Sequence, residues 1–212
     1  NSSSPEEHIA YIFQLLEDQG KGDYLGESIS QLEHCLQAAY FAEQEVNDED
    51  AIIAALLHDI GQFLPLSEIR NCKAGGTMID EEMGANVGRH GHDVIGQRWL
   101  LLHGWPRKVA SLVGAHVTSK RYVHTDYNQQ LPYGNSTRLF GIFVERIAGV
   151  TPNAGGPFTP EEVEEFKKDP DHEEMVKLRL WDDRAKVVGL ETPPLQHYKP
   201  MAERVLRRSL AV

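Results

Sequence analysis

Two polar residues interrupt an otherwise apolar stretch, AALLHDIGQF, at residues 54–63. His58 and Asp59 stand where the preceding alanines and leucines predict more buried core. A buried carboxylate is destabilising unless a counter-charge, a helix N-terminus or a metal offsets it. Neutral imidazole and carboxylate are ordinary ligands of first-row metals, so a metal would use both groups. The alternative is that the pair ends a helix and makes local hydrogen bonds, with Gly61 as the residue after the helix.

Three further histidines and one further aspartate lie within or directly after apolar helical patterns. They are His34 in QLEHCLQAAY, His92 in HDVIGQRWLL, His116 after SLVGA and Asp182 after LRLW. Metal sites in helical bundles are built from inward-facing side chains on neighbouring helices. Four histidines and two aspartates exceed what one structural zinc needs, and no cysteine takes part. The set therefore predicts two metal ions, with Asp59 as the bridge between them.

The bulk composition is ordinary for one soluble globular domain: 212 residues, 41% hydrophobic and 25% charged. The net charge of -11 argues against a nucleic-acid partner, which would need a basic patch, and against anionic membranes. No apolar run approaches the roughly 18 residues of a membrane span. No signal peptide is visible, and the two cysteines, Cys35 and Cys72, fit a reducing cytoplasm. We expect a cytoplasmic protein with a single domain over 1–212, in which 1–7 are flexible.

The elements that must position these side chains are predicted to be helices. Apolar periodicity and capping signals predict helices over 8–18, from Ser30, over 51–57 capped by Asp48 or Asp50, over 93–102, from Pro106, over 136–147, from Thr159, over 173–181 and over 197–210. Residues 64–91 contain several glycines and predict a long loop. We interpret the other histidines, His8, His103, His124, His172 and His197, as surface or locally hydrogen-bonded residues. The predicted fold class is an all-α bundle.

The order His…His-Asp…His…His…Asp resembles the HD superfamily in its dinuclear form. That resemblance implies an HD-domain helical bundle with a dinuclear site in its core. In GRHGHD, His90 is an alternative third ligand, but His92 fits the superfamily pattern of His, acid and Gly better. Dinuclear HD proteins are phosphohydrolases or, in a small branch, iron oxygenases. The ligand set alone leaves both open, as well as a catalytically silent binding module.

Residues outside the ligand set favour the oxygenase branch. DYLGESISQLEHCLQAAYFA, residues 23–42, closely resembles the N-terminal segment of the HD oxygenases that cleave the C–P bond of α-hydroxyphosphonates. HVTSKRY, residues 116–122, and KLRLWDD, residues 177–183, match two further segments, and AGGPFTPEE, residues 154–162, matches loosely. The resemblance extends from Tyr24 to Tyr198 and, more distantly, to inositol oxygenase. It implies two iron ions, mixed-valent Fe(II)/Fe(III), with O2 and a phosphonate as co-substrates.

The resemblance also implies residue roles. Tyr24 resembles a mobile tyrosine that caps one iron until the substrate displaces it, and Glu27 resembles the carboxylate that meets a cationic amino group of the substrate. Lys120 and Arg179 resemble phosphonate or active-site contacts. The chemistry agrees, because a phosphonate dianion favours Arg and Lys donors.

One substitution and one loop bear on the substrate. Gln62 stands where relatives with a primary-amine substrate have His, and the loop over 63–91 is longer than theirs. Both favour, slightly, a quaternary ammonium. We therefore expect cleavage of a 1-hydroxy-2-(trimethylammonio or amino)ethylphosphonate to phosphate and glycine betaine or glycine. The alternative is a metal-dependent HD phosphohydrolase of a nucleotide or phosphomonoester. The sequence indicates no oligomeric state.

Overall fold

The computed structural model describes residues 4–22, 24, 28–73, 91–130 and 156–211, and the side chains of 71–73 and 126–130 are excluded. Within these ranges the chain is helical and has no β-strand, which confirms the all-α prediction. The helices are α1 (Pro5–Gln19), α2 (Gln31–Glu45), α3 (Glu49–Leu57), α4 (Ile60–Phe63), α5 (Leu66–Lys73), α6 (His92–Leu102), α7 (Arg107–Gln130), α9 (Pro160–Phe166), α10 (His172–Arg184), the 3-10 helix η2 (Leu195–Tyr198) and α11 (Lys199–Leu210).

Several helices begin where the sequence predicts a cap. The side chains of Ser30 and Thr159 each accept a hydrogen bond from a backbone N–H three residues on. In return, the carboxylates of Glu33 and Glu162 accept from the backbone N–H groups of Ser30 and Thr159. Of the two candidates before α3, Asp48 is the cap, since its carboxylate accepts from the backbone N–H groups of Asp50 and Ala51. These side chains satisfy amides that the first helical turn leaves unpaired.

At the N-terminus, residues 5–7 belong to α1, because Ser4 caps that helix and forms a capping box with Glu7; the expected flexibility of 1–7 stays a prediction. The expectation of a loop throughout 64–91 is wrong, because this segment contains α5, which buries Ile69 in the core. The remainder of that segment, 74–90, and the predicted helix over 136–147 lie outside the described residues.

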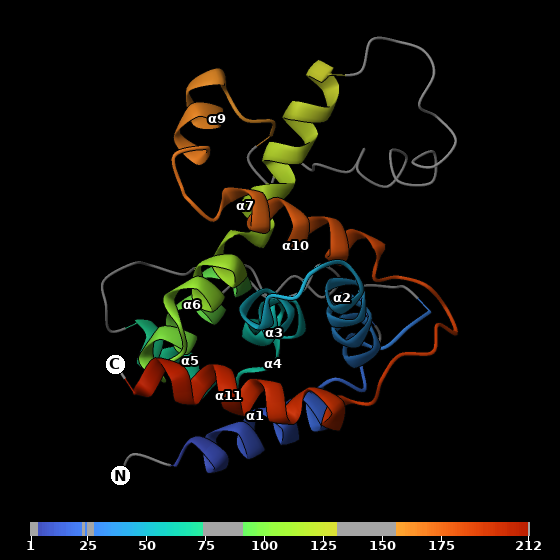
Figure 1. The fold of residues 1–212 in the computed structure, drawn as a ribbon, viewed down its shortest axis with the longest axis vertical. Coiled ribbons are helices and arrows are strands. Elements are labelled where there is room, and N and C mark those ends of the chain that lie inside the picture. Colours follow the sequence, from blue (N-terminus) through green and yellow to red (C-terminus); the bar gives the residue numbers. More distant parts are fainter. Residues whose placement is uncertain (1–3, 23, 25–27, 74–90, 131–155, 212) are drawn as a thin grey trace.

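Helix α3 lies at the centre of the bundle (Figure 1). It packs against α2, α7, α10 and α11, and every residue from Ala51 to Leu57 is buried. A helix that is apolar on all faces belongs in the interior. The residues that follow α3 therefore emerge in the middle of the molecule, enclosed by the surrounding helices.

Helices α7 and α9 extend beyond this bundle at the top of Figure 1. A small cluster of Tyr122, Val123 and Phe158 joins them. Arg121 pairs with Glu162 at 3.0 Å, and its guanidinium lies 4.7 Å from the centre of the Phe158 ring. These contacts fix α9 against the outer half of α7.

His8 is neither at the surface nor locally bonded, contrary to our interpretation. It is buried, its ring is stacked with those of Trp99 and His103, and its Nε2 accepts a hydrogen bond from Trp105 Nε1 at 3.1 Å. Its partners are about a hundred residues away in the chain, so the polar sequence around His8 gave no sign of this packing. His103 is locally bonded as expected, through Nδ1 to the carbonyl of Trp99.

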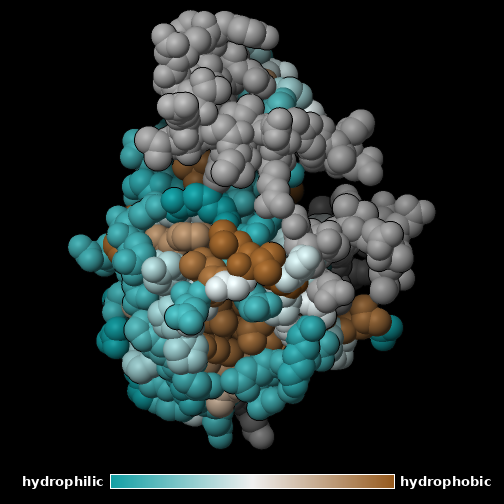
Figure 2. All heavy atoms as spheres, turned by 90° about the vertical axis from the view of Figure 1, so that its right-hand side faces the viewer, coloured by the Kyte–Doolittle hydropathy of each residue, from teal (hydrophilic) through white to brown (hydrophobic). Residues whose placement is uncertain are grey.

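The surface turned toward the viewer in Figure 2 is largely hydrophilic, with an apolar area near its centre. The segment that follows α10 runs along this side of the molecule (Figure 1) and carries two exposed valines, Val187 and Val188. Among the described residues, no helix combines the length and the apolarity that crossing a bilayer would require.

Candidate metal centre

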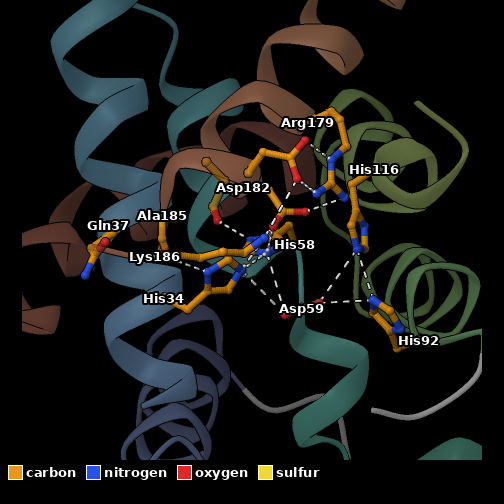
Figure 3. A network of polar contacts seen from close by, with 12 residues as sticks. His34, Gln37, His58, Asp59, His92, His116, Arg179, Asp182, Ala185 and Lys186 are labelled. Carbon is orange, nitrogen blue, oxygen red and sulfur yellow. Dashed lines mark hydrogen bonds and ion pairs between the residues drawn. The ribbon is translucent and has the colours of Figure 1, made fainter. Parts of the chain in front are cut away.

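The six side chains that the sequence singled out converge at the centre of the bundle (Figure 3). Two groups of three lie close enough to hold a metal ion each, with all ligand atoms within 4.8 Å of one another. The first triad is His34, His58 and Asp182, and the second triad is Asp59, His92 and His116. Each triad therefore consists of two imidazoles and one carboxylate.

Asp59 stands between the two triads and turns one oxygen toward each. Its Oδ1 lies 3.1 Å from His92 Nε2 and 3.7 Å from His116 Nε2. Its Oδ2 lies 3.6 Å from His58 Nε2 and 3.9 Å from His34 Nε2. This arrangement is the one that a bridging carboxylate would have.

Backbone carbonyls fix the orientation of three of the imidazoles. The Nδ1–H groups of His34, His58 and His116 donate to the carbonyls of Ala185, Ala55 and Val113 at 2.7, 2.8 and 2.7 Å. Because a carbonyl only accepts, Nδ1 must carry the hydrogen, and Nε2 of the neutral ring carries a lone pair. Metal-binding histidines commonly have this second hydrogen bond.

This tautomer leaves acceptor atoms facing one another in the buried first triad. The Nε2 atoms of His34 and His58 are 3.0 Å apart, and Asp182 Oδ1 lies 3.2 Å from His34 Nε2. Asp182 Oδ1 is buried without a hydrogen-bond partner, because neither imidazole has a hydrogen left to donate to it. A buried cluster of unpaired acceptors is unfavourable unless a cation lies among them. The residues present therefore fit a bound metal ion.

Burial and charge set protonation states that suit metal ligation. Burial, and then the neighbouring rings of His92 and His58, lowers the pKa of His116 to about 3. Burial also lowers the pKa of His58. For Asp182, burial opposes ionisation, but Arg179 and the adjacent imidazoles outweigh it and hold the pKa of the carboxyl well below its usual value. Neutral imidazoles and ionised carboxylates are the forms that bind metals.

The second triad depends on a close approach of two short segments. A Cβ on Gly61 would lie 2.0 Å from the carbonyl oxygen of His92, so only glycine fits there. A Cβ on Gly96, one turn further along α6, would lie 3.1 Å from side-chain carbons of Ile60 and Val113, a tight but milder contact. The two glycines let α4 and α6 come together, which places Asp59 beside His92.

The sequence that builds this centre matches a known family. The family model of the HD domain matches residues 32–144, which is more than half of the chain. The chain belongs to the HD domain family. The matched region of this HD-domain protein contains the paired His58 and Asp59 and three other histidines of the centre, while Asp182 lies beyond it.

Curated relatives extend the match over nearly the whole HD-domain protein. It is 35% identical over 211 residues to hydroxymethylphosphonate dioxygenase of Gimesia maris, covering 98% of this chain and 92% of that protein. It is 28% identical over 202 residues to [1-hydroxy-2-(trimethylamino)ethyl]phosphonate dioxygenase (glycine-betaine-forming) of Leisingera caerulea, covering 95% and 92%. An uncharacterized protein of Acanthamoeba polyphaga mimivirus is 30% identical over 204 residues, covering 96% and 84%. These relatives confirm the resemblance to HD-domain phosphonate oxygenases.

The resemblance also implies roles for residues outside the six, and the structure describes some of them but not all. Tyr24 is buried, and its ring stacks on His34 at 3.8 Å between ring centres. Burial, and then the carboxylates of Asp182 and Asp59, raises the pKa of Tyr24 well above 10, so the phenol stays protonated. Gln62 is half-buried on α4, three residues after Asp59. Glu27 lies outside the described residues.

Arg179 and Lys120 lie on the α7–α10 side of the first triad. Arg179 is buried and holds two carboxylates: its Nη1 lies 2.8 Å from Asp182 Oδ2, and its Nε and Nη2 bind both oxygens of Asp183. Burial, and then the charges of Arg179 and Lys186, lowers the pKa of Lys120, so these cations lie near one another. Lys186 is a further cation of this region that the sequence reasoning missed. Its place, four residues after Asp182, was the available signal.

Proposed function

We propose that this protein is an iron-dependent oxygenase that uses O2 to cleave the C–P bond of an α-hydroxyphosphonate. The carbon that carries the hydroxyl and the phosphonate would leave as a carboxylate, and the phosphorus as phosphate. The reaction R–CH(OH)–PO3(2−) + O2 → R–COO(−) + HPO4(2−) + H(+) balances without a further reductant. The observation that carries the proposal is the pair of triads bridged by Asp59 in a chain whose relatives are phosphonate dioxygenases.

The donor set supports iron. Each triad offers two imidazoles and one carboxylate, the ligand combination of many non-haem iron oxygenases, which leaves positions for substrate and O2. We propose that His34, His58, Asp182 and one oxygen of Asp59 hold one ion, and that His92, His116 and the other oxygen of Asp59 hold the second. When bound, two irons of mixed valence would supply the one-electron chemistry that reaction with O2 requires.

The protein's own contribution is to bind and orient the phosphonate. Lys120 is the proposed contact for the anion, and Arg179 acts beside it. Because Arg179 already binds Asp182 and Asp183, its main effect would be to fix the Asp182 carboxylate and to add positive charge to the substrate region.

Tyr24 would shield the first triad from water before the substrate binds. Its ring covers His34, and a protonated phenol adds no negative charge next to Asp182. We propose that the substrate displaces this ring when it binds.

The second triad is the more accessible to small molecules. Among the six side chains of the centre, that of His92 is the most exposed, at 17%.

The group next to the reacting carbon is the finer part of the proposal. The substrate class would be 1-hydroxy-2-(trimethylammonio or amino)ethylphosphonate, with Glu27 facing the cationic nitrogen and Gln62 lining the site. The products would be glycine betaine or glycine. The 35% identity to hydroxymethylphosphonate dioxygenase favours hydroxymethylphosphonate as a second candidate, which would need no contact from Glu27.

The test is aerobic incubation of the iron-loaded protein with these three phosphonates, with phosphate and the carboxylate product measured. The proposal expects both products in equal amounts in air and neither under argon. Phosphate release that continues under argon, from a phosphomonoester in place of a phosphonate, would identify a phosphohydrolase. A protein that binds no metal and turns over no compound of either class would be a silent HD module.

A further inference from the structure

Helix α2 holds the segment that follows α10 on both sides of Lys186. His34 donates to the carbonyl of Ala185 at 2.7 Å. One turn along α2, the buried Gln37 donates to the carbonyl of Val187 at 2.8 Å and accepts from the Val187 N–H at 2.9 Å. The backbone is therefore fixed immediately before and after Lys186, which lies beside the first triad in Figure 3.

The ammonium of Lys186 lies over Tyr24. Its Nζ is 5.9 Å from the centre of the Tyr24 ring, and that ring is stacked on His34. The side chain of Lys186 is only 17% exposed. Most lysines keep their ammonium in water. That of Lys186 lies largely buried beside the first triad, so solvation of its charge does not explain its position.

Lys186 is held more loosely than Arg179. Arg179 makes close contacts with both Asp182 and Asp183, whereas Lys186 Nζ is 3.8 Å from Asp183 Oδ1. A charge-assisted hydrogen bond is about 2.7–2.9 Å long. The ammonium can therefore form a new, shorter hydrogen bond without breaking a close one.

We propose that Lys186 is a phosphonate-binding residue: its ammonium, positioned by Gln37 and His34, hydrogen-bonds an anionic oxygen of the substrate when the Tyr24 ring moves off His34. This inference rests on the proposed function and adds a residue to the same site. The Tyr24 ring now lies against His34 and near the ammonium of Lys186. Substrate entry would replace a weak cation–π contact with a charge-assisted hydrogen bond.

The experiment measures anion affinity without turnover. Iron-loaded protein is titrated by calorimetry under argon with inorganic phosphate and with hydroxymethylphosphonate. The variants are Lys186→Met, which keeps the length of the side chain and removes its charge, and Lys186→Arg, which restores the charge. Lys168→Met is the matched control, because Lys168 is 71% exposed and pairs with Glu165 on α9. Metal content and thermal unfolding are recorded for each variant.

We expect Lys186→Met to weaken binding of both anions by on the order of 10- to 100-fold, with Lys186→Arg close to the wild type and Lys168→Met unchanged. The KM for a phosphonate should rise in Lys186→Met by a similar factor, with a smaller change in kcat. Equal affinity in Lys186→Met and the wild type would overturn the proposal, and so would a weakening that Lys168→Met shares. A loss of bound metal in Lys186→Met would also overturn it, because the lysine would then support the centre itself.

The two proposals fail separately. If the wild type binds phosphate through Lys186 but releases none from any α-hydroxyphosphonate in air, the proposed function is wrong and the anion site stands. If turnover is normal and Lys186→Met keeps the wild-type affinity and KM, the oxygenase stands and Lys186 is not part of its site.

Discussion

Arg179 binds the oxygen of Asp182 that faces away from His34 and His58, the other two residues of the first triad. The contact joins Nη1 to Oδ2 at 2.8 Å, while Oδ1 points toward His34 and His58. One oxygen of Asp182 is thus held by a guanidinium and the other is left for a cation. Such outer contacts orient a ligand and increase its affinity for the metal.

Arg179→Lys should weaken the first triad selectively. Lysine keeps the charge but cannot bind Asp182 and Asp183 together through a planar fork. We expect affinity for the ion of the first triad to fall roughly 10- to 100-fold, with the second triad little affected, as measured by metal competition and stoichiometry. Arg184→Lys is the control, since Arg184 lies on the same helix but pairs with Glu45. A loss of the same size in both variants would contradict the specific role.

Metal binding should stabilise the folded protein, because the ligand atoms come together only when the helices pack. At a free metal concentration of 100 times Kd, one site contributes about 2.7 kcal/mol. For a chain of this size the melting temperature should rise by roughly 5 to 10 °C. The measurement is thermal unfolding of chelator-treated protein with and without added Fe(II) under argon. An unchanged melting temperature would argue against a preformed metal centre.

Replacing Asp59 should affect the binding of both metal ions, and replacing Asp182 should affect the binding of one. Asp59 faces all four imidazoles, whereas Asp182 faces His34 and His58. Asp59→Ala should therefore reduce the metal content from two ions to none or to weakly bound metal, and Asp182→Ala should leave one ion per chain. Elemental analysis after gel filtration gives the stoichiometry. If Asp59→Ala retains one tightly bound ion, the carboxylate is not a bridge.

Five of the six residues that converge at the centre were predictable because they break a local pattern: each is polar in or next to an apolar helical stretch. For the sixth, the pattern left His90 and His92 open, and the resemblance to the HD superfamily favoured His92. Helix starts such as Ser30 and Thr159 were also predictable, because capping involves residues only three positions apart.

What the sequence did not show depends on contacts between distant segments. His34 meets Ala185 across 151 residues, and Gln37 meets Val187 across 150, so the sequence did not show that α2 fixes the backbone on both sides of Lys186. The only local signal for Lys186 was its place four residues after Asp182. His8 was misread for the same reason, since Trp99, His103 and Trp105 come from another helix and its end. Helix α5 was missed because the glycine-rich composition of 74–88 dominated the segment.

Gly61→Ala should disturb the second triad by steric contact alone. Its Cβ would lie 2.0 Å from the His92 carbonyl oxygen and 2.8 Å from the His92 carbonyl carbon, and backbone atoms of a helix cannot move aside cheaply. We expect a loss of about 1–3 kcal/mol or more in the free energy of unfolding, together with weaker metal binding at the second triad. Gly22→Ala is the control, because nothing lies within 4 Å of its added Cβ. Equal stability in the two variants would show that α4 and α6 need no such close approach.

The buried His8 should make stability depend on pH in a defined window. Burial, and then the neighbouring His103, lowers the pKa of His8 from 6.5 to about 4. Above pH 6.5 the ring is neutral in both the folded and the unfolded chain and contributes no pH dependence. As the pH falls from 6.5 toward 4, the unfolded chain takes up the proton first, so stability decreases; below about pH 4 the loss is complete. Since one pKa unit corresponds to about 1.4 kcal/mol, the loss is at most about 3.5 kcal/mol.

His8→Gln should remove this component while keeping an acceptor for Trp105 Nε1. The measurement is urea unfolding of both proteins at several pH values between 4 and 7.5. Because the other titrating groups are common to both, the difference in unfolding free energy isolates His8. We expect His8→Gln to be less stable than the wild type at pH 7.5, where stacking on Trp99 and His103 is lost, and the gap to narrow as the pH falls. A gap that stays constant across this range would mean that His8 is not held neutral by its surroundings.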